Sequence, residues 1–164
     1  MTCLTNLSLN DILFVDRGLS ELGNLIHLRS LDLGWTNIDD LEVSSFASLV
    51  NLELLYLQCN WLTGAAFHDL FGLTKLQTLN LSGNFDLTDD GILACARAFQ
   101  ALRYLIICYD GHGSDYPHIT SAAWRHLSMY ASPTLTHVDA VNMGLTPADE
   151  LVLARFQGER RTVR

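Results

Sequence analysis

The chain has 164 residues, of which 49% are hydrophobic and 17% charged, and its ten basic and eighteen acidic residues give a net charge of −8. This balance argues against nucleic acid as a direct partner, because the net charge repels phosphate backbones at long range. The longest uninterrupted apolar runs, such as 105–108, are far shorter than the roughly 20 residues that cross a bilayer, so membrane insertion is not expected.

A short leucine-rich phrase recurs along the chain, with leucines at its first, fourth and sixth positions: LTNLSL, LRSLDL, LELLYL and LQTLNL, then more loosely LRYLII and LTHVDA. The first four copies are 24 residues apart, and the spacing then widens to 26 and 33 residues. The six copies start at Leu4, Leu28, Leu52, Leu76, Leu102 and Leu135. Apolar residues alternate within each phrase, which is the period of a β-strand. The pattern predicts a solenoid of stacked units that leaves no stretch for a second domain.

The segment that returns from one strand to the next changes character along the chain. In the early units it repeats apolar residues 24 apart, such as Leu22, Phe46 and Leu70. In the later units a threonine, followed by acidic residues or proline, precedes apolar residues at helical spacing, which is typical of a helix start. We therefore predict helices over about 89–99, 121–131 and 147–157, followed by a tail over 158–164.

The phrase LELLYLQCNWL, from Leu52 to Leu62, resembles the LxxLxLxxNxL segment of the leucine-rich repeat proteins, and its recurrence makes the resemblance specific. The first units are similar to the 24-residue class. LTDDGILACARAF, from Leu87, is similar to the longer cysteine-containing and ribonuclease-inhibitor-like repeats. The resemblance implies one α/β solenoid domain over residues 1–164, shaped as a right-handed arc. A parallel β-sheet would line its concave face, with short turns and then helices on its convex face, and the arc would have a binding role.

The resemblance also implies a ladder of inward-turned asparagines. Asn60 and Asn84 occupy the position whose side-chain amide bonds backbone groups of neighbouring turns in this family. Thr36 and Ile12 stand there in the first two units, so the ladder is incomplete and those turns must satisfy their backbone amides in another way.

Candidate binding residues follow from the alternation of the strands. Side chains at outward strand positions would lie on the concave face, where the third and fifth strands are unusually apolar. Exposed aromatic residues of this kind are typical of protein-binding hot spots. The alternative is that some of these side chains pack against neighbouring rows. The predicted protein-binding residues are Trp35, Leu54, Tyr56, Tyr104, Ile106, Tyr109, Tyr116, His137 and Asp139.

An insertion over 110–118, near Trp124, is the competing contact surface, because long insertions in solenoids often carry contacts. Its residues His112, Asp115 and His118 are of metal-binding types. No cysteine pair supports a metal site there, so we expect neither a metal nor any other cofactor.

Catalysis has little support in the sequence. The acidic pairs at 39–40 and 89–90 begin return segments, where acids favour helix N-termini. No nucleophile is placed to complete a triad with His137 and Asp139, so we predict neither enzyme activity nor a small-molecule substrate.

The four cysteines show no close pairing, and no leader-like segment follows Met1. Both observations favour a reducing compartment, so we expect an intracellular and cytoplasmic protein. Strand alternation predicts that Cys108 is the most exposed thiol and that Cys95 lies on the apolar side of a helix.

These features predict a non-catalytic protein–protein interaction module that serves as a scaffold, adaptor or structural subunit of a larger assembly. The alternative is the substrate-recognition part of an F-box-type ubiquitin ligase, because LTDDGILACA resembles repeats found beside F-box domains, although no F-box precedes it here. The first strand would leave Leu7 and Leu9 at one end of the stack, so we expect a partner, a second copy or further sequence to cover that end.

Overall fold

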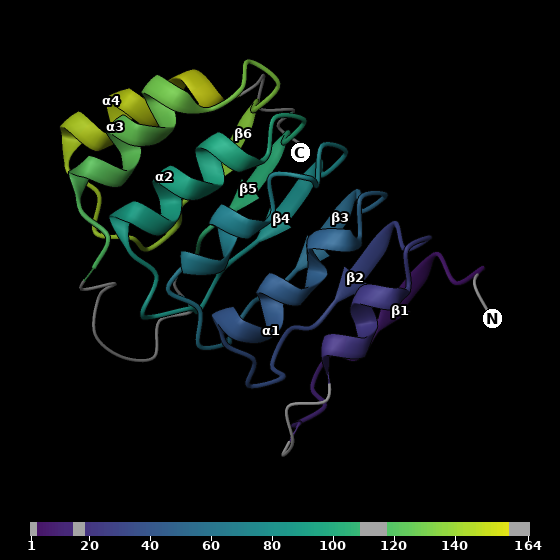
Figure 1. Ribbon diagram of the computed structural model, residues 1–164. Helices are drawn as coiled ribbons and strands as arrows, with labels where there is room; N and C mark the ends of the chain where they lie inside the picture. Colours follow the sequence, from purple (N-terminus) through teal and green to yellow (C-terminus); the bar gives the residue numbers. More distant parts are fainter. Residues whose placement is uncertain (1–2, 15–18, 109–117, 158–164) are drawn as a thin grey trace, which may run out of the picture.

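The computed structural model describes residues 3–14, 19–108 and 118–157, and its strands form one parallel sheet in chain order (Figure 1). The strands are β1 (Asn6–Ser8), β2 (Ser30–Asp32), β3 (Leu54–Tyr56), β4 (Thr78–Asn80), β5 (Tyr104–Ile106) and β6 (His137–Asp139). Each strand is the middle of one leucine phrase, and the middle residues of successive strands pair in register from Leu7 to Val138. The predicted repeat is therefore confirmed, including the two widened spacings.

The return segments lie on one face of this sheet, where Figure 1 shows them side by side from one end of the molecule to the other. They contain η1 (Leu19–Asn24), α1 (Asp40–Ser44), η2 (Ser45–Ser48), η3 (Ala65–Asp69), α2 (Asp89–Ala98), α3 (Ser121–Tyr130), α4 (Pro147–Leu153) and η4 (Ala154–Phe156).

The three predicted helices are present and each begins as its cap predicts, but the third ends as an α-helix at Leu153 and continues as the 3-10 turn η4. The side chains of Thr88, Thr120 and Thr146 accept hydrogen bonds from backbone amides in the first turns of α2, α3 and α4. Helix α1 was not predicted. Its five residues are too few for an apolar period to appear, and it is instead held by a capping box between Asp39 and Glu42.

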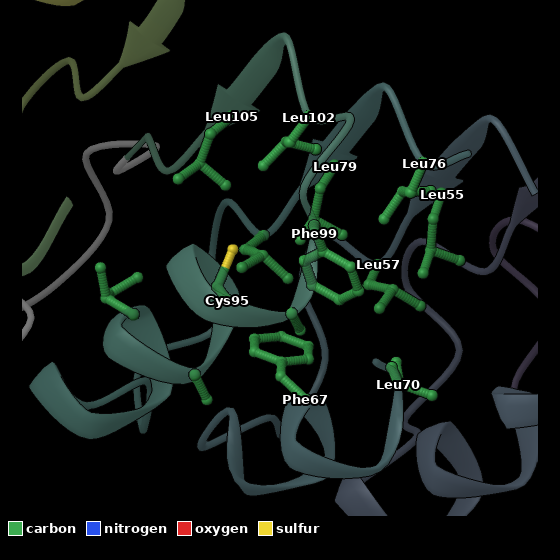
Figure 2. Close-up of a cluster of buried hydrophobic side chains, with 14 of the residues drawn as sticks. Leu55, Leu57, Phe67, Leu70, Leu76, Leu79, Cys95, Phe99, Leu102 and Leu105 are labelled. Atoms are coloured by element: carbon green, nitrogen blue, oxygen red, sulfur yellow. The ribbon is translucent and has the colours of Figure 1, made fainter. Parts of the chain in front are cut away.

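The core lies between the sheet and the return segments (Figure 2). Strand residues such as Leu55 and Leu79 have no exposed surface, and neither has Phe67 of η3. The rings of Phe67 and Phe99 pack edge to face with their centroids 5.8 Å apart, which joins the third unit to the fourth. Because every unit shares its core with the next, the core is continuous along the stack.

The asparagine ladder is present as the resemblance implies. The Asn60 side chain donates to the carbonyl oxygens of Leu33 and Leu57 at 2.8 and 3.1 Å, and its oxygen accepts from the backbone amides of Thr36 and Ile38 at 3.1 and 3.2 Å. The hydroxyl of buried Thr36 also donates to the Leu33 carbonyl. Thr36 and Asn60 of the next unit thus provide the hydrogen-bond partners for the backbone groups of the second turn.

Aspartates connect two of the return segments to the next unit. Asp40 accepts from the Thr63 hydroxyl at 2.6 Å and from the amides of Gly64 and Ala66 at 3.2 Å. Asp89 does the same for the start of α3, accepting from the Thr120 amide and hydroxyl at 2.8 and 2.6 Å. The acidic pairs are structural, as expected, and one member of each pair caps a segment in the following unit.

Candidate functional site

The concave face is the face of the sheet away from the return segments, and the strand register arranges its outward side chains in two rows. One row contains Ser30, Leu54, Thr78, Tyr104 and His137, and the other contains Asp32, Tyr56, Asn80, Ile106 and Asp139. Most of the predicted binding residues therefore share one surface. Polar β4 separates the apolar strand β3 from the apolar strand β5.

Tyr104 and His137 are in direct contact on this face. Their rings are stacked, with centroids 4.7 Å apart and planes inclined by 23°. Tyr104 is 45% exposed, whereas His137 is half-buried and its Nδ1 lies 2.9 Å from the Thr136 hydroxyl. The stack packs the two rings together and leaves part of the tyrosine ring exposed.

The other predicted concave residues differ in exposure. Leu54, Tyr56 and Ile106 are half-buried, because their neighbours in the rows cover part of each side chain. Asp139 at the outer end of the row is exposed. The exposed outward residues therefore lie at both ends of the sheet, in β1 at one end and in β5 and β6 at the other.

The remaining predicted contacts are elsewhere. Trp35 lies in the turn after β2 and not on the sheet, and it is 51% exposed. Tyr109 and Tyr116 lie outside the described residues, as do His112 and Asp115. Trp124 is only 2% exposed within α3, so it cannot contribute to a contact surface at the insertion.

The thiols differ from the prediction in one respect. Cys3 is exposed and Cys108 is half-buried, so the prediction that Cys108 is the most exposed thiol was wrong. The next unit covers Cys108, whose Sγ lies 3.7 Å from the Asp139 carbonyl oxygen, and burial raises the pKa of this thiol. The prediction for Cys95 is confirmed, because its side chain is completely buried on the inner side of α2. This burial raises the pKa of its thiol to about 12.

A hollow of about 1040 Å³ lies beside the outer edge of β6, between that strand and α4. His137, Asp139, Leu153 and Phe156 are among its lining residues. His137 also forms an isolated antiparallel bridge with Gln157 at this edge. Sequence reasoning missed this hollow because its walls come from a strand and a helix of different segments.

Within the described ranges, no group of three or more His, Cys, Asp or Glu side chains is placed to hold a metal ion. No helix found in the same ranges combines the length and the hydropathy that a membrane span requires.

Comparison with known families matches residues 26–84 to the leucine rich repeat model. The described sheet continues the same unit beyond that range on both sides. The described part of the chain therefore has the leucine-rich repeat fold, and residues 26–84 match the repeat family itself.

Several solved structures share this fold. The leucine-rich repeat-containing protein LegL7 from Legionella pneumophila is 17% identical, with a TM-score of 0.56, and the match covers 92% of this chain and 51% of LegL7. The tropomodulin C-terminal domain of Caenorhabditis elegans is 14% identical, with a TM-score of 0.54 and coverage of 94% and 85%. Leiomodin-1 actin-binding site 2 is 13% identical, with a TM-score of 0.53 and coverage of 93% and 80%. At these identities the likeness concerns the fold alone.

Proposed function

We propose that this chain is a non-catalytic module that binds a protein partner on its concave face. The stacked pair of Tyr104 and His137 is the observation that carries the proposal. Stacking fixes the tyrosine before a partner arrives, so little side-chain entropy is lost when the ring is covered. Tyrosine also combines a large apolar surface with a hydroxyl, which is why it is enriched in binding hot spots.

The surroundings of this pair define a surface suited to a protein. Ile106 lies beside the pair as an apolar contact, and exposed Asp139 provides charge at the margin. On the other side, Asn80 accepts a 3.0 Å hydrogen bond from the Ser82 amide, so its side-chain oxygen is already engaged. An apolar centre with a polar margin is the usual anatomy of a protein interface.

The test is capture of partners from a lysate of the source organism by the immobilised chain, quantified by mass spectrometry. Tyr104→Ala is compared with Thr78→Ala, which alters the residue paired with Tyr104 in the sheet. A partner retained by Thr78→Ala but reduced about 30-fold or more by Tyr104→Ala supports the concave face. Partners that bind both variants equally well would contradict the proposal.

The identity of the captured proteins separates two versions of this function. We propose that the chain is a scaffold, adaptor or structural subunit of a larger assembly, in which case one set of proteins is recovered in fixed stoichiometry. The alternative, substrate recognition within an F-box-type ubiquitin ligase, rests on the LTDDGILACA segment and requires recovery of cullin-type machinery.

Actin is the first named partner to test. The basis is the match to leiomodin-1 actin-binding site 2, of which this chain covers 80%. Co-sedimentation with actin filaments and binding to monomeric actin test it directly, with Tyr104→Ala as the variant. If neither form of actin binds, actin is excluded and the wider proposal of a protein partner is unaffected.

A further inference from the structure

The loops that follow the strands form a second surface, separate from the concave face. Backbone hydrogen bonds stack these loops in register, from the Trp35 amide to the Gln58 carbonyl at 2.9 Å and from the Cys59 amide to the Ser82 carbonyl at 2.7 Å. The four loops, 9–14, 33–39, 57–63 and 81–87, therefore run along the carboxyl ends of β1 to β4, and we call them the strand-end edge.

Large apolar side chains are exposed along the strand-end edge. They are Ile12, Leu13, Trp35, Trp61 and Phe85. The two tryptophans are 51% and 60% exposed and come from adjacent loops, which are joined by a 2.9 Å hydrogen bond from the Trp61 amide to the Ile38 carbonyl. Single exposed apolar residues are ordinary, but a row of them on stacked loops is typical of a contact surface.

Trp35 occupies an unfavourable backbone position. Its φ is 57°, in the left-handed region, and the equivalent residues of other units have similar values. Those residues are Asp11, Cys59, Gly83 and Asn142, all small or short. A tryptophan fits this region poorly, and its half-exposed side chain gains little burial in return. Folding stability does not account for Trp35, and strained residues of this kind concentrate at binding sites.

The charge of the strand-end edge indicates what it binds. The four loops contain Asp11, Asp39 and Asp86 but no lysine or arginine. The edge is therefore both acidic and aromatic, which argues against nucleic acid and favours a cationic partner.

We propose that the strand-end edge binds an extended, arginine-bearing segment of a partner protein. The flat guanidinium group stacks on an indole ring and at the same time donates hydrogen bonds to a carboxylate, so it matches both features of the edge. Lysine, a compact and strongly hydrated charge, matches only the carboxylates. Apolar residues between the arginines would contact Leu13 and Phe85.

The test uses a fluorescently labelled synthetic peptide of sequence GRLRLRG, whose binding to the full chain is followed by anisotropy. Trp35→Asn and Trp61→Ala are each expected to weaken binding at least tenfold, and the same peptide with lysine in place of arginine should bind several-fold more weakly. Phe71→Ala is the matched control, because Phe71 is 50% exposed but lies outside these loops, and it should change the affinity less than twofold. Tyr104→Ala should also leave the affinity unchanged, which separates this surface from the concave face.

Thermal unfolding of Trp35→Asn tests whether the backbone at Trp35 is strained, since asparagine tolerates a left-handed conformation. Its melting temperature should equal or exceed that of the unsubstituted chain. The proposal is overturned by a large fall in that temperature, by the absence of saturable binding below about 1 mM peptide, or by equal weakening in Phe71→Ala. Self-association of the chain that Trp35→Asn abolishes would also overturn it, because a second copy would then be the occupant.

Discussion

The ring of Tyr104 stacks on the ring of His137 across two neighbouring strands, at a centroid distance of 4.7 Å. The two residues are also register partners in the sheet, so the contact joins the fifth unit to the sixth on the concave face. The pair therefore acts as one surface element. Its two members should not contribute independently to binding or to stability.

The first prediction is that Tyr104→Ala and His137→Ala are non-additive. Each should lower the free energy of unfolding by about 1.5 kcal/mol or less, because the side chains lie outside the core. Each should weaken partner binding by about 2 kcal/mol or more. A double-mutant cycle by chemical denaturation and binding measures the coupling, and purely additive effects would show that the stack has no energetic role.

The second prediction concerns the shared core. Leu79 has no exposed surface, so Leu79→Ala should lower the free energy of unfolding by about 2–5 kcal/mol and reduce cooperativity by separating the units on either side. Thr78→Ala, one residue away on the outward side, should have little effect. A loss below about 1 kcal/mol for Leu79→Ala in denaturant unfolding would contradict the core assignment.

The third prediction distinguishes two adjacent carboxylates. Asp89 caps the start of α3 in the next unit, accepting hydrogen bonds from Thr120 and Ala123, whereas Asp90 is exposed in the first turn of α2. Asp89→Ala should lower the free energy of unfolding by about 1–3 kcal/mol and speed amide hydrogen exchange at the start of α3. Asp90→Ala removes only a favourable interaction with the helix dipole and should lower the free energy of unfolding by about 0.3–1 kcal/mol. Equal costs would mean that the cross-unit cap is unimportant.

The fourth prediction is a pH dependence that arises from Asp149. Burial alone would raise the pKa of this carboxyl, but hydrogen bonds from Thr146 and Ser121, together with the charge of Arg125, hold the pKa below its ordinary value. A lowered pKa means that the folded state binds the proton less readily than the unfolded state. The stabilisation is therefore complete above the unfolded pKa of about 4 and is lost as pH falls through the folded pKa.

Denaturant unfolding between about pH 2.5 and 6 measures this effect. The unsubstituted chain should lose stability more steeply below about pH 4 than Asp149→Asn, which has no proton to bind at this position. Parallel curves for the two proteins would show that other carboxylates account for the acid sensitivity.

The fifth prediction concerns the order in which three of the thiols react. Cys3 should react with a disulfide reagent within the mixing time at pH 8, Cys108 more slowly, and Cys95 only after unfolding, because burial disfavours its thiolate. Peptide mapping of the labelled sites measures this order. Rapid labelling of Cys95 in the native protein would require its helix to open readily.

The sequence by itself determined the repeat, the strands and the three longer helices. Each of these depends on local signals: a leucine such as Leu55 at a fixed period, or a cap such as Thr120 before a helical pattern. Alternation within each strand also identified the two rows of the concave face, since side chains of one strand must point to opposite sides of a sheet.

Only the tertiary structure decided which side chains meet between units. Asp89 reaches Thr120 across 31 residues, the Tyr104 and His137 rings stack, and Cys108 is covered by the following turn. The left-handed turn that holds Trp35 is likewise set by the stacking of one loop on the next. Local sequence patterns do not encode such contacts, because each depends on the orientation of two segments that come together only when the solenoid forms.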